Sequence, residues 1–326
     1  MTKRGCVRMV QALYLTEADV GRLVTVGDAI AVLEQVFASW GDRGTTNLPR
    51  QRAALSGGSF NLMGAACEKE GVFGLKAYFA GHGGARYHVL LYAADGSGLR
   101  AMIEANRLGA LRTGAASGLA TKLLANPRAR TLGVIGSGKQ ARTQVAAIAA
   151  VRPIERIRVY SRAQVRRNAF AFAVADELGI ETEPVESGEA CVADADVVVT
   201  ITKSAEPVCQ SQWLRKGVHI NAAGANSADR RELDPDIVLR AAVRVTDDRA
   251  QAQVEAAEFR DLASAGRLEW SDVTELGDIV TGKARGRTAA SEITLYKSLG
   301  IALEDIAFAE LIYRRALEAK MGRALS

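Results

Sequence analysis

The chain contains 326 residues, enough for about two domains, and 48% of them are hydrophobic, as in a globular protein with a sizeable core. Its 42 Lys and Arg residues are nearly balanced by 37 Asp and Glu residues, for a formal net charge of +5, and the two signs are interspersed along most of the sequence. This distribution argues against a nucleic-acid-binding protein, in which basic residues gather on one element.

Neither a targeting segment nor a set of paired cysteines is expected. Met1 to Val10 is basic but lacks an apolar signal core, and no apolar run approaches the roughly 18 residues that span a bilayer. The cysteines stand far apart, with no C-x-x-C pair and no His at a metal-ligand spacing: Cys6, Cys67, Cys191 and Cys209. We therefore expect no disulfide framework, no zinc site, no membrane partner and a cytosolic location.

The N-terminal part of the chain predicts helices followed by antiparallel strands. Thr16 is placed to cap a helix, and residues 29–40 carry apolar side chains at helical spacing. Short apolar runs separated by glycine then predict strands at 60–63, 72–79 and 87–92, with a turn at Asp95-Gly96. A long helix is expected from Asn106 to Leu124.

A glycine-rich turn follows an apolar run in the middle of the chain, where Thr131 to Ala141 reads Thr-Leu-Gly-Val-Ile-Gly-Ser-Gly-Lys-Gln-Ala. Gly136 permits the turn, Gly138 lets the backbone approach a pyrophosphate, and Ala141 lets the next helix pack on the strand. In a chain with 31 glycines the pattern alone also arises by chance, but the flanking strand and helix favour dinucleotide binding. The loop residues expected to bind are Gly136, Ser137, Gly138, Lys139, Gln140 and Ala141.

Strands and helices alternate after this loop, which predicts a doubly wound parallel sheet. The run from Asp196 to Thr202 is almost wholly apolar, as in sheets that are covered on both faces. Further strands are expected at 157–160, 219–224, 242–246 and 291–296, and helices at 163–178, 235–240, 250–264 and 302–320. We expect the last helix to return to the first domain.

The residues after the second expected strand of this sheet favour NADP, although NAD is possible. An NAD site places Asp or Glu about 20 residues past the glycines, whereas this chain has Ser161-Arg162, followed by Arg166 and Arg167. Guanidinium groups suit a 2′-phosphate. The alternative is that these arginines form a solvated helix face. Thr200 is expected at the strand end where the nucleotide crosses the sheet.

Six motifs, in order and at their separations, resemble the ornithine cyclodeaminase and mu-crystallin family from about Leu15 to the C-terminus. They are Leu48-Pro49-Arg50, Gly74-Leu75-Lys76, Leu111-Arg112-Thr113, Gly136 to Ala141, Arg231-Glu232-Leu233 and Glu292 to Gly300. Several are common individually, but their ordered combination is specific. The family includes cyclodeaminases, amino-acid dehydrogenases and ketimine reductases that use a nicotinamide dinucleotide, and a lens and hormone-binding protein.

The resemblance implies an α/β protein with two domains that forms a homodimer. Residues 118–302 are expected to form the Rossmann domain that binds NAD(P). Residues 1–117 with 303–326 are expected to form a discontinuous α+β domain for substrate binding and dimerisation. By the same resemblance, Thr113 and Ser298 lie close to the phosphates and the nicotinamide.

By motif, Arg50, Lys76 and Arg112 resemble the family's cluster that holds the substrate carboxylate. A guanidinium clamps a carboxylate through two hydrogen bonds, and an ammonium adds a compact charge. Each alone is otherwise an ordinary surface cation, and Arg52 is an alternative to Arg50 if the alignment slips. Lys76 is also the candidate proton donor to a substrate nitrogen, because burial beside other cations lowers the pKa of a lysine.

Asn226 stands where the family's cyclodeaminases carry an aspartate. An amide neither pairs with a substrate ammonium as an anion nor accepts its proton, so cyclodeamination is in doubt. In the alternative interpretation Asn226 is a loop residue and Asp229 takes over. Tyr78 and Phe79 place aromatic bulk near the expected pocket or in the core. The histidines are too scattered for a metal site or a triad: His82, His88 and His219.

The leading hypothesis is an NAD(P)H-dependent oxidoreductase that acts on the C–N or C=N bond of an amino or imino acid. It would transfer hydride at the carbon next to a carboxylate held by Arg and Lys. The alternatives are an ornithine cyclodeaminase-like lyase and a non-catalytic NADP-binding protein similar to mu-crystallin.

Overall fold

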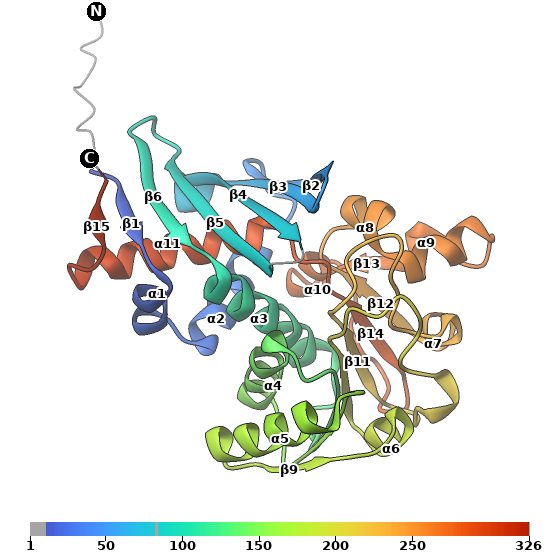
Figure 1. Ribbon diagram of the computed structural model, residues 1–326. Helices are drawn as coiled ribbons and strands as arrows, with labels where there is room; N and C mark the ends of the chain where they lie inside the picture. The colour runs from blue at the N-terminus through green and yellow to red at the C-terminus, as the bar shows by residue number, and fades with distance from the viewer. Residues whose placement is uncertain (1–10, 82–83, 326) are drawn as a thin grey trace, which may run out of the picture. The chain divides into compact units, whose positions relative to one another are not determined.

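The computed structural model describes residues 11–81 and 84–325, so Cys6, the basic N-terminal segment and His82 lie outside the described residues. Contacts divide the chain into a first unit, Met1–Arg112 with Ile301–Ser326, and a second unit, Thr113–Gly300 (Figure 1). The domain boundaries expected from the sequence, after residues 117 and 302, stay a prediction.

The first unit contains a sheet that, within the described residues, has seven strands in the order β15-β1-β6-β5-β4-β3-β2. The strands are β1 Leu13–Leu15, β2 Thr45–Leu55, β3 Gly58–Cys67, β4 Val72–Gly81, β5 Gly84–Ala93, β6 Gly98–Glu104 and β15 Arg323–Ala324. Neighbours from β2 to β6 are antiparallel, and β1 runs parallel to β6. The expected turn at Asp95-Gly96 joins β5 to β6, and Gly96 has a φ of +84° there.

Four α-helices accompany this sheet in the described chain: α1 Glu17–Leu23, α2 Val26–Ala38, α3 Asn106–Leu124, which continues into the second unit, and α11 Ala302–Glu318. Thr16 and Thr25 begin α1 and α2 with capping boxes. The carboxylate of Glu17 accepts hydrogen bonds from the N–H groups of Asn106 and Arg107, at 2.6 and 2.8 Å, and so fixes the start of α3. Helix α11 packs along β2 to β6, as Figure 1 shows.

The alternation of side chains along the strands gives this sheet two different faces. Met63 of β3, Lys76 of β4 and Val89 of β5 are cross-strand neighbours on the buried face. The opposite face exposes large apolar side chains: Leu48, Phe60, Leu62, Phe73 and Phe79. Phe79 therefore points away from Lys76, whereas Tyr78 shares its face.

The second unit contains a parallel sheet of eight strands among the described residues, in the order β13-β12-β14-β11-β10-β7-β8-β9. They are β7 Thr131–Ile135, β8 Arg156–Tyr160, β9 Glu181–Pro184, β10 Val197–Thr200, β11 His219–Ala222, β12 Val243–Thr246, β13 Val273–Glu275 and β14 Thr294–Lys297. The chain order reverses between β7 and β10, where a doubly wound sheet binds nucleotides. The doubly wound Rossmann architecture expected from the sequence is confirmed.

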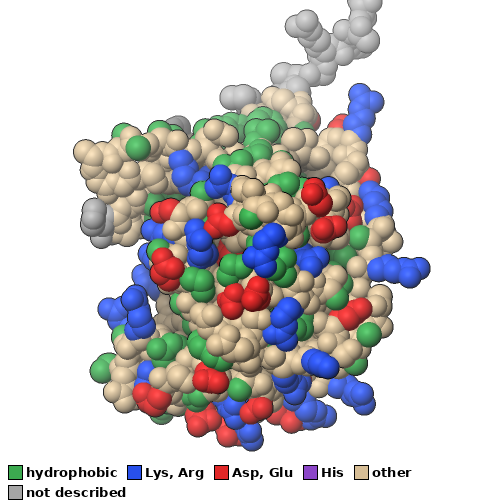
Figure 2. Space-filling view, turned by 90° about the vertical axis from the view of Figure 1, so that its right-hand side faces the viewer, with side chains coloured by type: hydrophobic (Ala, Val, Ile, Leu, Met, Phe, Trp, Pro, Cys, Tyr) green, Lys and Arg blue, Asp and Glu red, His purple; other side chains and the backbone are tan. Residues whose placement is uncertain are grey.

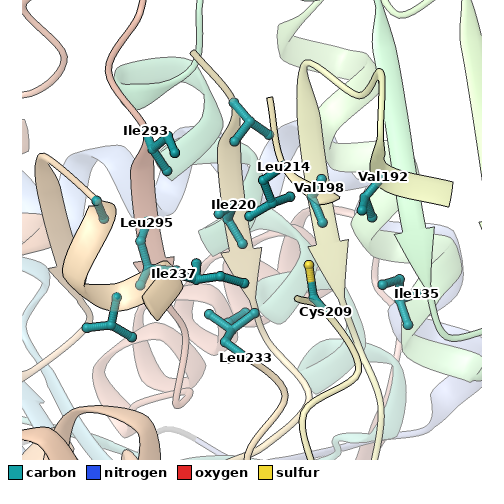
Figure 3. Close-up of a cluster of buried hydrophobic side chains, with 14 of the residues drawn as sticks. Ile135, Val192, Val198, Cys209, Leu214, Ile220, Leu233, Ile237, Ile293 and Leu295 are labelled. Atoms are coloured by element: carbon teal, nitrogen blue, oxygen red, sulfur yellow. The ribbon is translucent and has the colours of Figure 1, made fainter. Parts of the chain in front are cut away.

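The helices of this unit are α4 Lys139–Val151, α5 Gln164–Leu178, α6 Gly188–Val192, α7 Pro235–Arg240, α8 Arg249–Glu255, α9 Ala257–Ser264 and α10 Leu276–Val280. Short 3-10 helices occur at Glu68–Glu70 in the first unit and at Ser211–Trp213 and Trp270–Asp272 in the second. Figure 3 shows one core, in which Val198, Ile220 and Leu295 from neighbouring strands pack with Ile237 of α7.

Two expected elements differ from the structure. The single helix predicted over 250–264 is two helices, α8 and α9, separated at Ala256. Gln251 is a buried residue of α8, and Phe259 is a buried residue of α9. The last strand begins at Thr294 rather than at 291, because the carboxylate of Glu292 accepts hydrogen bonds from Thr288 and Ala289 and holds that segment in a turn.

Candidate active site

Arg50, Lys76 and Arg112 all lie in the first unit, on β2, β4 and α3, and all are buried. The β2–β3 register shifts between Leu48 and Gln51, so Arg50 sits at an irregularity of the strand. It donates from Nε to Met63 Sδ at 3.3 Å, whereas Arg52 is exposed. The geometry thus favours Arg50 over Arg52 as the third member of the cluster.

The cationic side chains meet the start of α11. Asp305 Oδ1 lies 2.9 Å from Lys76 Nζ and 3.0 Å from Arg112 Nε. Glu304 Oε2 lies 2.9 Å from Arg112 Nη1. Both acidic residues have no exposed surface. We call Arg50, Lys76, Arg112, Glu304 and Asp305 the charged cluster. It brings together three buried cations and two buried acidic residues.

Burial and mutual attraction set the protonation of the charged cluster. Burial lowers the pKa of Lys76 to about 8, although the Asp305 carboxylate acts in the opposite direction. Burial acts to raise the pKa of Asp305, but the charges of Arg112 and Lys76 outweigh it and the pKa is lowered. For Arg112 burial is outweighed by Asp305 and Glu304, and its pKa is raised. Lys76 is therefore the member of the cluster poised to exchange a proton near neutral pH.

Two aromatic rings and helix α3 lie close to the Lys76 ammonium. Its Nζ lies 5.1 Å from the centre of the Tyr87 ring, which packs against Tyr78 at 4.5 Å. A methyl group placed on Gly109 of α3 would lie 3.2 Å from the same nitrogen. Helix α3 therefore comes close to the Lys76 ammonium at this point.

Sequence reasoning missed Glu304 and Asp305. Two adjacent acids in the first turn of a helix normally indicate an interaction with the helix dipole and solvent. The signal available was their setting, between the apolar residues Leu303 and Ile306, which leaves little room for a solvated face.

In the second unit, the glycine loop joins β7 to α4 as expected. Gly136 has a φ of +120°, and a methyl group there would lie 2.5 Å from the carbonyl oxygen of Ile201. Above Gly138, by contrast, a methyl group would meet nothing within 4 Å, and α4 has no side-chain cap. Ala141 is fully buried. The open space over Gly138 at an uncapped helix N-terminus fits a dinucleotide pyrophosphate, with Ser137, Lys139 and Gln140 beside it.

The end of β8 carries no acidic side chain. Ser161 Oγ lies 2.8 Å from Ser137 Oγ, which links the strand end to the glycine loop. Arg162 and Arg166 are exposed. Arg167 was expected either near a 2′-phosphate or on a solvated helix face. Instead it is buried, donates to the Ser161 carbonyl at 3.1 Å and pairs with Glu186. It stabilises the turn, which leaves Arg162 and Arg166 available to a phosphate.

Other expected nucleotide residues lie at the carboxyl edge of the sheet or beside α4. Thr200 ends β10 and Ser298 follows β14, the strands on either side of β11, and their hydroxyls are buried without a hydrogen-bond partner in the described chain. Buried hydroxyls of this kind fit a bound group that supplies the missing partner. Thr113 is buried, and its carbonyl accepts a hydrogen bond from Gln144 of α4 at 3.1 Å.

Asn226 follows a loop that a buried carboxylate holds. Glu232 accepts hydrogen bonds from Thr202 N and Oγ1, at 2.6 and 2.8 Å, and from the N–H groups of Gly224 and Ala225, at 2.7 and 3.2 Å. Asn226 comes next and is half-buried, whereas Asp229 is exposed and accepts from Ser227 at 2.6 Å. Asn226 is therefore less exposed than Asp229, the alternative considered in the sequence analysis.

The network around Glu232 continues into the unit. Its own N–H donates to Glu258 at 2.9 Å, and Glu258 pairs with the buried Lys297 at 3.0 Å. Glu232 was noticed in the sequence only as part of a motif, and its role in tying the ends of β10 and β11 together was not expected.

His219, Cys67 and Cys191 are buried and lie outside the charged cluster. His219 is fully buried and hydrogen-bonded to Thr294 and Asn221, and burial lowers its pKa to about 3. Burial raises the pKa of Cys67 and of Cys191 to about 12. Within residues 11–81 and 84–325, no group of three His, Cys, Asp or Glu side chains is arranged to hold a metal ion.

The surface and the helices give two further observations. On the face in Figure 2, basic and acidic side chains are interspersed. Among the helices of the described chain, none combines the length and the apolar character that crossing a membrane requires.

Known proteins resemble this chain over most of its length. A Δ1-pyrroline-2-carboxylate reductase of Bacillus cereus is 36% identical over 226 residues, which cover 69% of each chain. The structure of Thermococcus litoralis Δ1-pyrroline-2-carboxylate reductase in complex with NADH and L-proline has a TM-score of 0.92 at 31% identity, covering 96% of this chain and all of the other.

An archaeal alanine dehydrogenase dimer with bound NAD has a TM-score of 0.91 at 29% identity, covering 97% of this chain and 99% of the other. Residues 10–320 match the family described as ornithine cyclodeaminase/mu-crystallin. The motifs that resemble this family, the two-unit fold and this match agree, and the chain belongs to the ornithine cyclodeaminase/mu-crystallin family.

Proposed function

We propose that this protein reduces the C=N bond of a cyclic imino acid with NADPH. The chain is an NAD(P)H-dependent oxidoreductase that acts on C–N and C=N bonds next to a carboxylate. The observation that carries the finer proposal is the charged cluster, which gathers three buried cations beside two buried acidic residues in the first unit.

The charged cluster fits a substrate carboxylate. Gathering three cations away from water is costly without anions, so a cluster of this kind suits an acidic ligand. The ion pairs of Arg112 use Nε and Nη1, which leaves Nη2 available for a carboxylate oxygen. Arg50, a buried residue of β2, is the other guanidinium of the charged cluster. We assign carboxylate binding to Arg112 and Arg50.

Lys76 is assigned as the proton donor to the imine nitrogen. With a pKa of about 8 it is largely protonated at neutral pH and gives up its proton readily. The bound nicotinamide dinucleotide supplies a hydride to the imine carbon. The nitrogen takes the proton of Lys76, an amino acid is formed, and Lys76 recovers a proton from solvent.

The preference for NADPH over NADH is part of the proposal. Related structures hold NADH or NAD, so the family accommodates both the reduced and the oxidised cofactor without a 2′-phosphate. In this chain Ser161 replaces the acidic residue that would repel a 2′-phosphate, and the exposed Arg162 and Arg166 offer positive charge. These features support NADPH.

Asn226 supports reduction over cyclodeamination. Its amide offers neutral hydrogen bonds where a cyclodeaminase uses an aspartate, so the second ammonium of a diamine substrate would lack a counter-charge. An imine needs only a held carboxylate, a proton and a hydride. The intact charged cluster likewise favours an enzyme over a protein that only binds NADP.

We also propose that the protein is a homodimer, with the exposed apolar face of the first unit's sheet as the contact. Phe73 stacks on Tyr92 on this face with ring centres 5.2 Å apart, beside Leu48, Phe60 and Leu62. A contiguous apolar face of this kind indicates a protein interface. A related alanine dehydrogenase is a dimer. A cytosolic location stays a prediction.

The test is a substrate panel followed by nicotinamide absorbance. Δ1-Pyrroline-2-carboxylate, a six-membered cyclic imino acid, and 2-oxo acids with ammonia are each supplied with NADPH or NADH, and ornithine with NAD. We expect oxidation of NADPH with a cyclic imino acid. Ammonia release from ornithine without net change of the cofactor would instead place the protein among the cyclodeaminases.

A further inference from the structure

We propose that Asp305 is a positioning residue that holds Lys76 and Arg112 on one carboxylate oxygen and keeps Lys76 protonated for transfer to the substrate nitrogen. The inference rests on the proposed reduction. It concerns a residue of α11 that contributes no group to substrate or cofactor but acts through the two cations that it contacts.

The geometry shows why one oxygen orients both cations. Asp305 Oδ1 accepts from Lys76 Nζ at 2.9 Å and from Arg112 Nε at 3.0 Å. The two donors come from β4 and α3, so a single carboxylate ties a strand to a helix. A shared acceptor restricts Lys76 and Arg112 to one relative arrangement. That arrangement sets the carboxylate-binding group and the proton donor at a fixed separation.

The second oxygen of Asp305 has a different environment. Oδ2 is buried and has no hydrogen-bond partner in the described chain. A buried carboxylate oxygen without a partner is rare and costly. It is available to accept a hydrogen bond from Lys76 as the ammonium turns, so the proton donor stays paired while it moves toward the substrate.

The charged side chains that lower the pKa of Lys76 and the one that raises it come from different helices and strands. Arg50 on β2 and Arg112 on α3 repel its positive charge, and Asp305 on α11 attracts it. Tyr78 on β4 and Tyr87 on β5 are the other titratable side chains close by, and β3 presents the uncharged Met63. Asp305 is thus the acidic residue in contact with Lys76, whereas Glu304 contacts Arg112.

This arrangement predicts different effects for the two neighbouring acids. Replacing Asp305 removes the one attraction that keeps the proton on Lys76 against burial and two cations. Replacing Glu304 weakens the placement of Arg112 and leaves the attraction between Lys76 and Asp305 in place. Asp305 should therefore govern the pH dependence of turnover, and Glu304 the binding of the substrate carboxylate.

The experiment compares Asp305→Asn with Glu304→Gln as the matched control. The dependence of kcat/KM on pH is measured with NADPH and the best cyclic imino acid. The wild type should lose activity as pH rises through about 8, where Lys76 loses its proton. In Asp305→Asn this alkaline limb should move to lower pH by roughly 1 to 3 units, the usual effect of an opposite charge in contact. Glu304→Gln should raise KM and leave the limb in place.

A second measurement does not depend on turnover. Trace acetylation of Lys76, followed by mass spectrometry across pH, reports the fraction of neutral amine, and its midpoint should move down in Asp305→Asn and stay in Glu304→Gln. If the wild type turns over no imine, the proposed function fails, and this midpoint still decides the role of Asp305. An unmoved midpoint, or an unmoved alkaline limb, would overturn the inference.

Folding is checked by thermal unfolding of each variant. Asp305→Ser removes the same charge with a smaller polar side chain, and it replaces Asp305→Asn if that variant does not fold. If neither folds, the wild-type midpoint decides. A value of about 8 or higher supports an ammonium held by Asp305 against burial and two cations, whereas a value well below 7 contradicts it.

Discussion

Asp305 in the first unit and Glu232 in the second are both fully buried, but their partners are different. Asp305 contacts the cationic side chains of Lys76 and Arg112, whereas Glu232 accepts hydrogen bonds mainly from the N–H groups of two loops. The pKa of Asp305 is lowered because the cations outweigh burial, and the pKa of Glu232 is raised because burial outweighs the attraction of Lys297.

The difference separates two uses of a buried acid. The partners of Asp305 carry full charges that suit anion binding and proton transfer, so we assign this acid to the proposed reaction. Glu232 accepts hydrogen bonds from backbone N–H groups of the loops after β10 and β11 and holds these loops in place, so we assign this acid a structural role. If this distinction is correct, substitutions in the charged cluster of the first unit should change catalysis, and substitutions in the loops of the second unit should change folding or nucleotide binding.

The largest effect is expected from Lys76→Met, which removes the proton donor. Turnover of an imino acid should fall by roughly 10² to 10⁴-fold, the usual contribution of a positioned acid. NADPH binding should stay near wild type because the glycine loop belongs to the other unit. Steady-state kinetics and fluorescence titration measure the two effects.

The matched control is Lys69→Met, which changes an exposed lysine of the same unit. It should leave turnover and stability unchanged. If Lys76→Met keeps wild-type turnover, or if it weakens NADPH as much as it weakens catalysis, the division of work between the two units is wrong.

Next in size is the contrast between two glycines of the same loop. In Gly136→Ala the new methyl group would lie 2.5 Å from the Ile201 carbonyl at a φ of +120°, so the unfolding temperature should drop. In Gly138→Ala the methyl group meets nothing within 4 Å, so folding should be unaffected. It would occupy the space of the pyrophosphate, and nucleotide affinity should fall. Equal affinity for NADPH in Gly138→Ala and wild type would contradict the assigned cradle.

The sequence predicted the strand, the glycine turn and the helix around Gly136 because their signal is local. Gly136, Gly138 and Ala141 lie within six residues, and each spacing has a steric reason. The alternation of strands and helices likewise predicted the parallel sheet, since apolar periodicity reports which faces are buried.

The charged cluster was only half predictable, because its anions come from far along the chain. Asp305 lies 229 residues after Lys76 and 193 after Arg112. No local pattern states that a strand at 72–81 and a helix at 302–318 will bring these charges together. The break at Ala256 was also hidden, because both helices around it have good helix-forming residues and tertiary packing decides their directions.

A smaller effect is expected from Arg162→Ala on the choice of nucleotide. Loss of a charge-assisted contact to the 2′-phosphate should weaken NADPH by about 1.5 to 3 kcal/mol, or roughly 10- to 150-fold, and leave NADH unchanged. Arg128→Ala is the control, since Arg128 is exposed before β7 at the opposite edge of the sheet. Equal affinities for NADPH and NADH in the wild type would remove the basis for the preference.

The smallest effect is a difference in pH dependence between the two buried acids. The folded state lowers the pKa of Asp305 below its ordinary 3.8, so Asp305 contributes stability above pH 3.8 that is lost as pH falls through the lowered value. The free-energy advantage of wild type over Asp305→Asn should therefore shrink in acid.

Glu232 should behave in the opposite way. Its pKa is raised above the ordinary 4.5, so the folded protein takes up a proton before the unfolded chain does, and the resulting stabilisation is complete below pH 4.5 and lost as pH rises through the folded value. The advantage of wild type over Glu232→Gln should grow between neutral pH and 4.5. At neutral pH the Gln variant should still lose roughly 1 to 3 kcal/mol, because its amide NH₂ faces N–H donors. Urea unfolding at several pH values, with the exposed Glu181→Gln as control, measures both trends; slopes of the same sign would show that the two carboxylates are held alike.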